Sequence, residues 1–292
     1  MQNNHLNQLS LLLLAMLFIS TSGTLGRFID MSIPVIIWWR SILAAFLLYG
    51  FCRYKKISLK LLSKKDLLLF IVSGLFLATH WITYFYALKL SNVAIGMLSL
   101  FVYPILTALI EPLFIKIKFD PVYIILGIMV LIGIYILAPE FNLESTYVQG
   151  ALFGLLSALF YAIRNIISKQ MIVPYNSTTI MLYQIVIISI VLSPVLFILD
   201  TSGMDTQYPY IIILAVITTA VGHTMLVNSL RHFTVSTASI ISSIQPILGI
   251  LIAVVFLNEI PSWNTFFGGL IILSTVIIES IRSKKKNKGP SR

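Results

Sequence analysis

The chain has 292 residues, of which 58% are hydrophobic and only 10% are charged, whereas soluble domains carry about 25% charged residues. This composition excludes an ordinary soluble protein and is typical of a chain that crosses the membrane many times. The net charge of +10 does not indicate a nucleic-acid partner, because the Lys and Arg residues gather between apolar runs rather than on one amphipathic face.

Apolar runs long enough to cross a bilayer follow one another from Leu9 onward. A hydrocarbon core of about 30 Å needs about 20 apolar residues per helix, and short segments rich in Pro, Asn, Asp or charged residues separate the runs. The first run is longer than the apolar region of a secretion signal and lacks a convincing cleavage site, so we interpret it as a membrane span. We predict ten transmembrane helices, at residues 9–28, 33–51, 67–87, 93–115, 121–138, 148–168, 178–198, 209–229, 235–257 and 263–281.

The positive charges predict which side of the membrane holds the termini. If the N-terminus is cytoplasmic, seventeen Lys and Arg residues fall in cytoplasmic segments and two, Arg27 and Lys89, fall outside. Arg164 is among the seventeen, and Arg40 lies within the second span. This asymmetry is the positive-inside pattern. It predicts a multi-pass protein of the plasma or inner membrane with both termini in the cytoplasm.

The two halves of the chain resemble each other at an offset of 142 residues. The offset aligns Arg27 with Lys169, Lys89 with Arg231, Pro104 with Pro246 and Gly127 with Gly269. Chance alignment of apolar sequences is the alternative, but it explains a shared mid-helix proline less well. Five spans per repeat oblige the second copy to enter the bilayer from the opposite face. We therefore predict an all-α polytopic membrane protein of two inverted five-helix repeats, residues 1–145 and 146–292.

Late in each repeat the chain carries related polar and proline-containing segments. They are Ala-Leu-Lys-Leu-Ser-Asn-Val-Ala at 87–94, Tyr-Pro-Ile-Leu-Thr-Ala-Leu-Ile-Glu-Pro at 103–112, Asn-Ser-Leu-Arg at 228–231, Gln-Pro-Ile-Leu-Gly at 245–249 and Leu-Asn-Glu at 257–259. In these segments the chain resembles the drug/metabolite transporter superfamily, in its EamA-type ten-helix branch. The resemblance implies a substrate cavity between the repeats, exposed to each side in turn, and export of amino acids or other metabolites. The first repeat departs from the pattern, because Ile117 stands where the second repeat has Glu259.

Charged and polar residues within the spans are the candidates for a substrate site, since ionisable groups there usually face the bundle interior or a wet cavity. Arg40, beside Trp39, lies near the middle of span two and can pair with a carboxylate or phosphate through two hydrogen bonds. A structural contact with helix-end carbonyls is the alternative. We expect Gln184 to be its counterpart in the second repeat. A positive cavity would favour an anionic or zwitterionic solute.

Two histidines are candidates for coupling proton movement to transport, because histidine titrates near neutral pH. His80 and His223 are expected about 5 Å from the midplane on opposite sides, in spans three and eight. Simple hydrogen bonding within the bundle is the alternative. Glu111 in span four is a further candidate, either as a proton carrier or as an ion-pair partner of Arg164.

Aromatic and amide side chains extend the candidate site. Helical spacing places His80 and Tyr84 on one face, where the tyrosine can stack against a solute and form hydrogen bonds with it. Core packing is the alternative for this face. Weaker candidates of the same kind are Tyr103, Tyr161, Asn165 and Gln245.

Prolines and small residues predict how the helices pack. Pro104 and Pro246 interrupt the middle of spans four and nine, and each frees the carbonyl four residues earlier. Such backbone at membrane depth needs protein or cavity water beside it, so we expect both spans to kink and to border the pathway. The series Gly150, Gly154, Ala158 and Ala162 predicts close helix packing, more within the chain than in a dimer. Monomer and homodimer both stay open.

The predicted function is secondary transport that exports small polar metabolites, such as amino acids, by alternating access. The expected partners are a small-molecule substrate, the lipid bilayer and a coupling proton. Cys52 is the only cysteine and no Cys/His metal spacing occurs, so we expect no metal and no cofactor. No nucleotide-binding or catalytic motif indicates ATP-driven transport or an enzyme. A nucleotide-sugar or nucleobase carrier and a non-transporting membrane scaffold are the alternatives.

Overall fold

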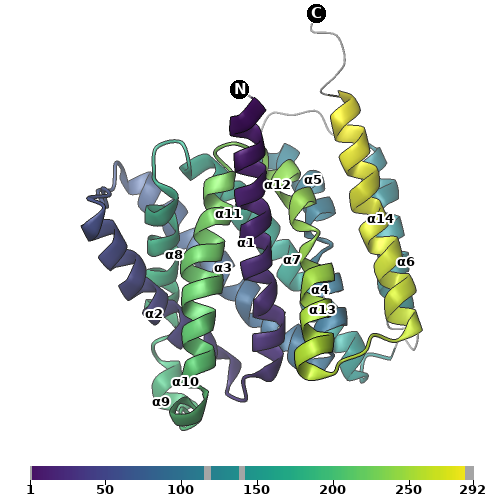
Figure 1. Ribbon diagram of the computed structural model, residues 1–292, viewed down its shortest axis with the longest axis horizontal. Coiled ribbons are helices and arrows are strands. Elements are labelled where there is room, and N and C mark those ends of the chain that lie inside the picture. The colour runs from purple at the N-terminus through teal and green to yellow at the C-terminus, as the bar shows by residue number, and fades with distance from the viewer. Residues whose placement is uncertain (1, 115–119, 138–141, 287–292) are drawn as a thin grey trace, which may run out of the picture.

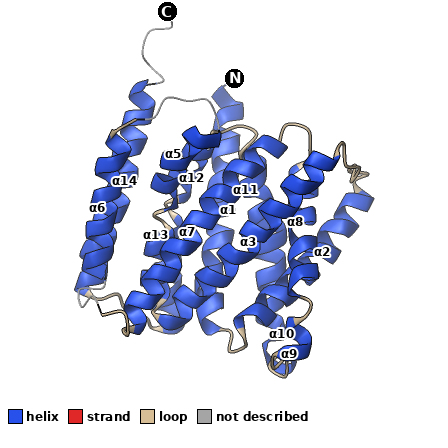
Figure 2. Cartoon of the chain, turned by 180° about the vertical axis from the view of Figure 1, so that it is seen from behind, coloured by secondary structure: helices blue, strands red, loops and turns tan. Residues whose placement is uncertain are grey.

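The computed structural model describes residues 2–114, 120–137 and 142–286, and this part of the chain contains helices and connections but no strand (Figure 2). Eight helical segments are long and apolar enough to cross a membrane. Two shorter apolar helices, Val122–Leu137 and Trp263–Glu279, bring the total to ten. The predicted all-α polytopic fold is thereby confirmed.

The two halves of the chain run through the bundle in opposite directions. The first half contains α1 (Gln2–Phe28), α2 (Ile33–Tyr54), α3 (Lys64–Leu90), α4 (Val93–Leu100), α5 (Tyr103–Phe114) and α6 (Val122–Leu137). The second contains α7 (Thr146–Met171), α8 (Ser177–Leu192), α9 (Val195–Ile198), α10 (Met204–Ile213), the π-helix η1 (Leu214–His223), α11 (Thr224–Ser229), α12 (Val235–Ser242), α13 (Gln245–Leu257) and α14 (Trp263–Lys286). Figure 1 shows the start of α1 and the end of α14 at one end of the bundle, whereas α7 begins at the other end.

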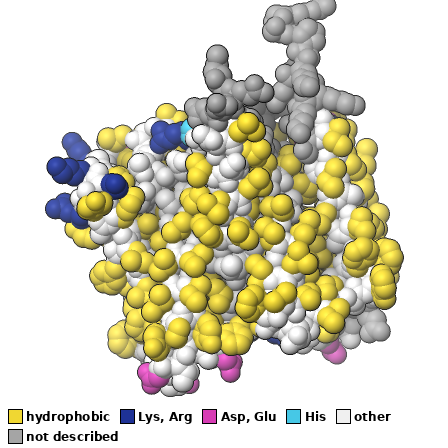
Figure 3. All heavy atoms as spheres, in the orientation of Figure 1, with side chains coloured by type: hydrophobic (Ala, Val, Ile, Leu, Met, Phe, Trp, Pro, Cys, Tyr) yellow, Lys and Arg dark blue, Asp and Glu magenta, His cyan; other side chains and the backbone are white. Residues whose placement is uncertain are grey.

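The charged residues mark the two ends differently. In Figure 3 Lys and Arg gather at the end where α1 begins, Asp and Glu appear at the opposite end, and hydrophobic side chains cover the surface between them. Such a surface suits contact with lipid. We call these the basic end and the acidic end. Lys55 and Lys60 lie in the connection between α2 and α3, and Arg231 lies in that between α11 and α12, whereas Asp200 lies between α9 and α10 and Glu259 between α13 and α14.

Polar caps fix where several helices begin. The side chain of Asn92 accepts a hydrogen bond from the Ile95 amide at 2.9 Å, and the Thr234 hydroxyl accepts one from the Thr237 amide at 3.1 Å. Asn and Thr are favoured at this position because they satisfy amides that have no partner within the helix. These two caps start α4 and α12, which occupy equivalent places in the two halves.

Spans four and nine are each divided into two helices just ahead of a proline. The break between α4 and α5 falls at residues 101–102, before Pro104, and the break between α12 and α13 falls at residues 243–244, before Pro246. Proline has no amide hydrogen and therefore cannot continue the bonding of the preceding turn. The chain thus turns at two places at mid-bundle rather than bending one continuous helix.

Span eight contains a π-helix that the sequence pattern does not reveal. Where we expect one continuous helix, α10 passes into η1 and then α11. The Thr218 and Thr219 hydroxyls both donate to the Leu214 carbonyl, at 2.5 and 3.0 Å. The two hydroxyls thus donate hydrogen bonds to the Leu214 carbonyl within the wider π-helical turn. π-helical turns are frequent at functional sites.

Small residues of α7 form a tight seam with α3 and α4. A Cβ atom added to Gly150 would lie 2.6 Å from the Ser91 Cβ, and one added to Gly154 would overlap the Ser99 side chain. Any larger side chain at these places would push the helices apart. The small-residue series therefore packs within the chain, as expected.

Candidate functional site

A small enclosed chamber lies where helices from the two halves meet. Its volume is about 20 Å³, which is room for a water-sized group. Five of the residues predicted for the substrate site line it, namely His80, Tyr84, Tyr161, His223 and Gln245. The other lining residues are Ile19, Ser22, Trp81, Leu100 and Phe101. The lining thus comes from α1, α3, the α4–α5 break, α7, η1 and α13.

His80 is held firmly in the wall of the chamber. Its Nδ1 lies 2.7 Å from the Ser157 hydroxyl and 3.2 Å from the Ser157 carbonyl, while the Ser157 hydroxyl donates to the His80 carbonyl at 2.9 Å. Because a carbonyl only accepts, the contacts are satisfied when Nδ1 carries the proton, which leaves Nε2 as the acceptor of the ring. The imidazole stacks on Tyr161 at 4.2 Å between ring centroids and on Tyr84 at 6.2 Å.

His223 faces the same chamber from the last residue of η1. It is buried, and its Nδ1 has no hydrogen-bond partner among the described residues. Its ring meets Trp81 edge to face at 5.4 Å and Tyr161 at 6.4 Å. The two histidines predicted on opposite sides of the midplane thus share one chamber, and both rings contact Tyr161.

Tyr103 and Gln245 support this aromatic group. Tyr103 meets Tyr161 edge to face at 4.8 Å, and its hydroxyl donates to the Ser239 carbonyl at 3.5 Å. The Gln245 amide nitrogen lies 2.8 Å from the Met16 sulfur. Both residues stand beside a proline break. Gln245 lines the chamber, whereas Tyr103 does not line it and contacts Tyr161 from behind the wall.

Arg40 lies behind the Trp81 side of the chamber. Its guanidinium carbon is 4.0 Å from the Trp81 ring centroid, a cation–π contact. Nε and Nη2 donate to the Thr219 hydroxyl at 3.0 and 2.8 Å, and Nη2 also donates to Thr218 at 3.1 Å. Nη1 has no partner among the described residues. The π-helix therefore presents two neighbouring hydroxyls to one buried arginine.

A second buried arginine forms a polar cluster of its own. Arg164 donates to the side-chain oxygen Oε1 of Gln184 from Nε at 3.1 Å and from Nη2 at 2.5 Å, and to Oδ1 of Asn165 from Nη1 at 3.0 Å. Gln184 in turn donates to the Ser73 and Ser168 hydroxyls. Gln184 and Asn165 are thus placed around Arg164, and Gln184 bonds to that residue rather than standing opposite Arg40.

Two expectations about Arg164 are wrong. It is not a cytoplasmic loop residue, because it is fully buried in α7. Nor does it pair with Glu111, whose carboxylate accepts a hydrogen bond from Ser236 at 2.6 Å. The positive-inside pattern misplaced Arg164 because a sequence count cannot distinguish a loop cation from one that finds neutral acceptors inside the bundle.

Trp39 does not line the chamber. Its indole meets Trp38 edge to face at 4.8 Å, and its Nε1 has no partner among the described residues. Trp38 donates to the Ser189 carbonyl at 2.9 Å. The pair therefore joins α2 to α8, away from the chamber.

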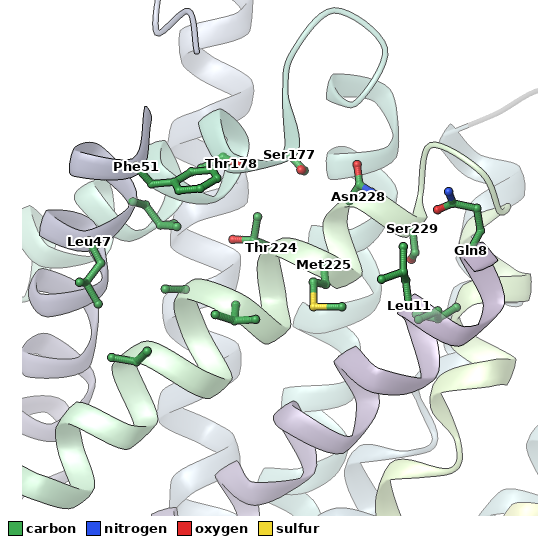
Figure 4. A pocket seen from close by; sticks show the side chains of 15 residues that line it. Gln8, Leu11, Leu47, Phe51, Ser177, Thr178, Thr224, Met225, Asn228 and Ser229 are labelled. Carbon is green, nitrogen blue, oxygen red and sulfur yellow. The ribbon is translucent and has the colours of Figure 1, made fainter. Parts of the chain in front are cut away.

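A larger cavity of about 450 Å³ opens among α1, α2, α8, η1 and α11 (Figure 4). Its polar lining residues are Gln8, Ser177, Thr178, Thr224, Asn228 and Ser229, and its apolar ones include Leu11, Leu47, Phe51 and Met225. Gln8 and Ser177 lie near the helix ends that face the basic side. The cavity therefore adjoins the basic end and shares η1 with the chamber.

An ion pair bridges helices at the acidic end. Arg27 Nε lies 2.9 Å from a Glu259 oxygen, and the other Glu259 oxygen accepts from the Val93 amide at 2.9 Å. Arg27 also donates to the Lys89 carbonyl, and Lys89 donates to the carbonyls of Arg27 and Ile29. This network ties the end of α1 to α3, α4 and the segment after α13.

The sequence did not single out several residues of the site. Trp81, Ser157, Thr218 and Thr219 hold His80, His223 or Arg40 in place. A Thr-Thr pair inside an apolar span is a signal for the last two. Their joint contact with Arg40 depends on the π-helical turn, which has no simple periodicity.

Together, a bundle of ten helices in two inverted halves and a polar chamber at their seam define a multi-pass membrane transporter. The profile of the EamA-like transporter family matches residues 7–138 and 148–280, once in each half. The chain belongs to the EamA-like transporter family.

Named relatives agree with this assignment. The pseudopaline exporter CntI of Pseudomonas aeruginosa (strain UCBPP-PA14) is 24% identical over 251 residues, which cover 86% of each chain. The transporter YxxF of Bacillus subtilis (strain 168) is 24% identical over 254 residues, covering 84% of this chain and 80% of its own. A crystal structure with 16% identity superposes with a TM-score of 0.71 over 96% of this chain and 98% of its own, which supports the fold.

Proposed function

We propose that this transporter is a secondary carrier that exports small polar metabolites, such as amino acids, by alternating access. The observation that carries the proposal is the chamber, which takes its walls from helices of both halves. Inverted repeats of this kind bind their substrate at the seam between the repeats, near the midplane, and expose it to each side in turn. We take residues 1–145 and 146–292 as the two repeats.

The two ends suggest the order of events. With a volume of about 20 Å³ the chamber admits no metabolite until it widens. The Arg27–Glu259 pair bridges helices at the acidic end, where a cavity of about 330 Å³ lies beside Asp30 and Lys89, whereas the basic end holds the larger cavity of about 450 Å³. We place the basic end and both termini in the cytoplasm of a plasma or inner membrane, in agreement with the positive-inside pattern. A cytoplasmic solute would then enter through this cavity, reach the chamber and leave past the ion pair.

His80 and His223 are proposed to carry the coupling proton. Both rings contact Tyr161 in the chamber, and His80 keeps one ring nitrogen as an acceptor. Histidine is the side chain suited to a proton exchange near neutral pH. Substituting both with glutamine should remove the pH dependence of transport while the protein still folds. An unchanged pH profile would exclude the coupling role.

Transport itself is tested by counterflow in proteoliposomes, with radiolabelled amino acids and other small polar metabolites offered one by one. We expect saturable exchange for at least one solute, and none in protein-free liposomes. Ser22→Trp is the blocking variant, because Ser22 lines the chamber and an indole would fill it. Exchange that persists in Ser22→Trp places the pathway elsewhere. The absence of exchange for every solute contradicts the proposal.

A further inference from the structure

Two positive charges are buried in the bundle without a negative partner. Arg40 and Arg164 are both 0% exposed. The ion pairs among the described residues involve Arg27 and Arg282, and neither buried arginine takes part in one. A guanidinium stays protonated in proteins, and an uncompensated buried charge is costly. The interior therefore carries a positive charge that an anion would neutralise.

The two arginines differ in the donors that they have left. Each nitrogen of Arg164 has an acceptor, on Gln184, Asn165 or Met181. Arg40 uses Nε and Nη2 on the two threonines of η1, and its Nη1 has no partner among the described residues. Arg40 is thus the arginine with a donor to offer.

Arg40 is also placed to act on the chamber. Its guanidinium packs on Trp81, whose ring lines the chamber, and it lies within electrostatic range of His80, Tyr84 and His223. A shift of the Trp81 ring as the chamber widens would expose Nη1 to a bound solute. His223, whose Nδ1 also has no partner among the described residues, lines the same chamber.

The walls of the chamber offer no carboxylate to a positive solute. Its ten lining residues include no Asp or Glu, so an ammonium group would find no carboxylate there. The two arginines would repel it. An amino acid would therefore bind through its carboxylate, while the two arginines would disfavour its ammonium group.

We propose that the chamber selects small solutes that carry a carboxylate and a net negative charge, with Arg40 as the residue that anchors the carboxylate. This inference rests on the proposed transport function and narrows its substrate class. N-acylated amino acids and hydroxy acids have this chemistry, whereas free amino acids have it in part.

The inference is tested with sets of solutes that share one side chain and differ in net charge. Purified protein in nanodiscs is titrated with N-acetyl-phenylalanine, phenylalanine and phenylalanine amide, followed by the matching leucine and serine sets, and binding is measured by calorimetry. We expect the N-acetyl member of at least one set to bind most tightly and the amide most weakly. Arg40→Gln should weaken binding of that N-acetyl compound about ten- to hundredfold, the range for a charged hydrogen bond. It should not weaken binding of the amide, whose ammonium group loses one repelling charge.

Matched variants separate the anchor from general charge and from folding. Arg282→Gln removes one positive charge at the end of α14, where Arg282 pairs with Asp120 and Glu279, and it should leave the series unchanged. Thr219→Val keeps the Arg40 charge but removes its main acceptor, so it should weaken binding severalfold while the order of the series persists. It also provides the test if Arg40→Gln does not fold.

Three outcomes overturn the inference. They are equal affinity across each series in wild-type protein, tighter binding of an amide, and no binding by any N-acetyl member. Counterflow with the same solutes distinguishes this failure from failure of the transport function, because a carrier that exchanges neutral or cationic solutes equally well remains a transporter without the anionic preference.

Discussion

The acidic and basic ends of the bundle are built from equivalent positions, yet different contacts hold the helices together at each end. Arg27 and Lys89 at the acidic end correspond to Lys169 and Arg231 at the basic end. At the basic end Lys169 donates to the carbonyls of Leu230 and Phe233, and Arg231 donates to the carbonyl of Tyr175. These cations contact helix ends, as their counterparts do.

The two ends differ in the carboxylate of Glu259, which lies at the acidic end. Glu259 joins Arg27 to the amide of Val93 at the acidic end. Ile117 is the counterpart of Glu259 in the first half, and it lies outside the described residues. Asn258 adopts a left-handed conformation, with φ of 55°, and ends α13 directly before Glu259. A repeat with one altered residue can thus hold one end of a carrier more tightly than the other.

The largest expected effect comes from removing the carboxylate. Glu259→Gln loses the ion pair and weakens the contact with Val93, so the acidic end should open more often. In a Cys52→Ala background, a cysteine in place of Ser22 reports access to the chamber. We expect an impermeant thiol reagent applied from the acidic side to label it about tenfold faster, as for the loss of one charged hydrogen bond. An unchanged labelling rate would show that the pair does not hold this end.

A double-mutant cycle sharpens the same comparison. Arg27→Met and Glu259→Gln each remove one partner of a half-buried pair, and the effects of neighbours in one network are not additive. The double variant should open little more than either single variant, with a coupling energy of about 1–2 kcal/mol. Labelling rates of the four proteins give this energy. Fully additive effects would mean that the two residues act separately.

A smaller effect is expected at the basic end. Lys169→Met loses two hydrogen bonds to carbonyls but leaves no carboxylate without a partner. Labelling of a cysteine in place of Thr224, which lines the basic-end cavity, should change by less than about threefold, since the two part-buried hydrogen bonds of Lys169 run to neutral carbonyls rather than to a carboxylate. A change as large as that of Glu259→Gln would remove the asymmetry on which the comparison depends.

The smallest effect concerns the chamber between the ends. Ser157→Ala removes the hydroxyl that contacts His80 Nδ1 but leaves the Ser157 carbonyl as an acceptor. We expect the free energy of unfolding to fall by about 1 kcal/mol and transport to lose no more than about threefold. Denaturation and counterflow measure the two quantities. Complete loss of transport would make Ser157 part of the pathway rather than a support for the imidazole.

The sequence predicted the ten spans well because apolar length is a strong signal, and the prolines indicated where two spans divide. The sequence also indicated five residues that line one chamber, because polar residues inside apolar helices are few. They are His80, Tyr84, Tyr161, His223 and Gln245. Gln184 shows the limit of sequence-based prediction. Its hydrogen bonds with Arg164 depend on which way each helix faces its neighbours, and the sequence does not reveal this. The two threonines beneath Arg40 depend in addition on a π-helical turn that no periodicity predicts.

Alternating access through the acidic end is tested most directly by locking that end. Cysteines in place of Arg27 and Glu259, in the Cys52→Ala background, are joined by a short bifunctional thiol reagent that reduction cleaves. The account predicts that cross-linking stops counterflow and access to the chamber from the acidic side, leaves access from the basic side intact, and is reversed by reduction. Counterflow that continues at full rate in the cross-linked protein would contradict it.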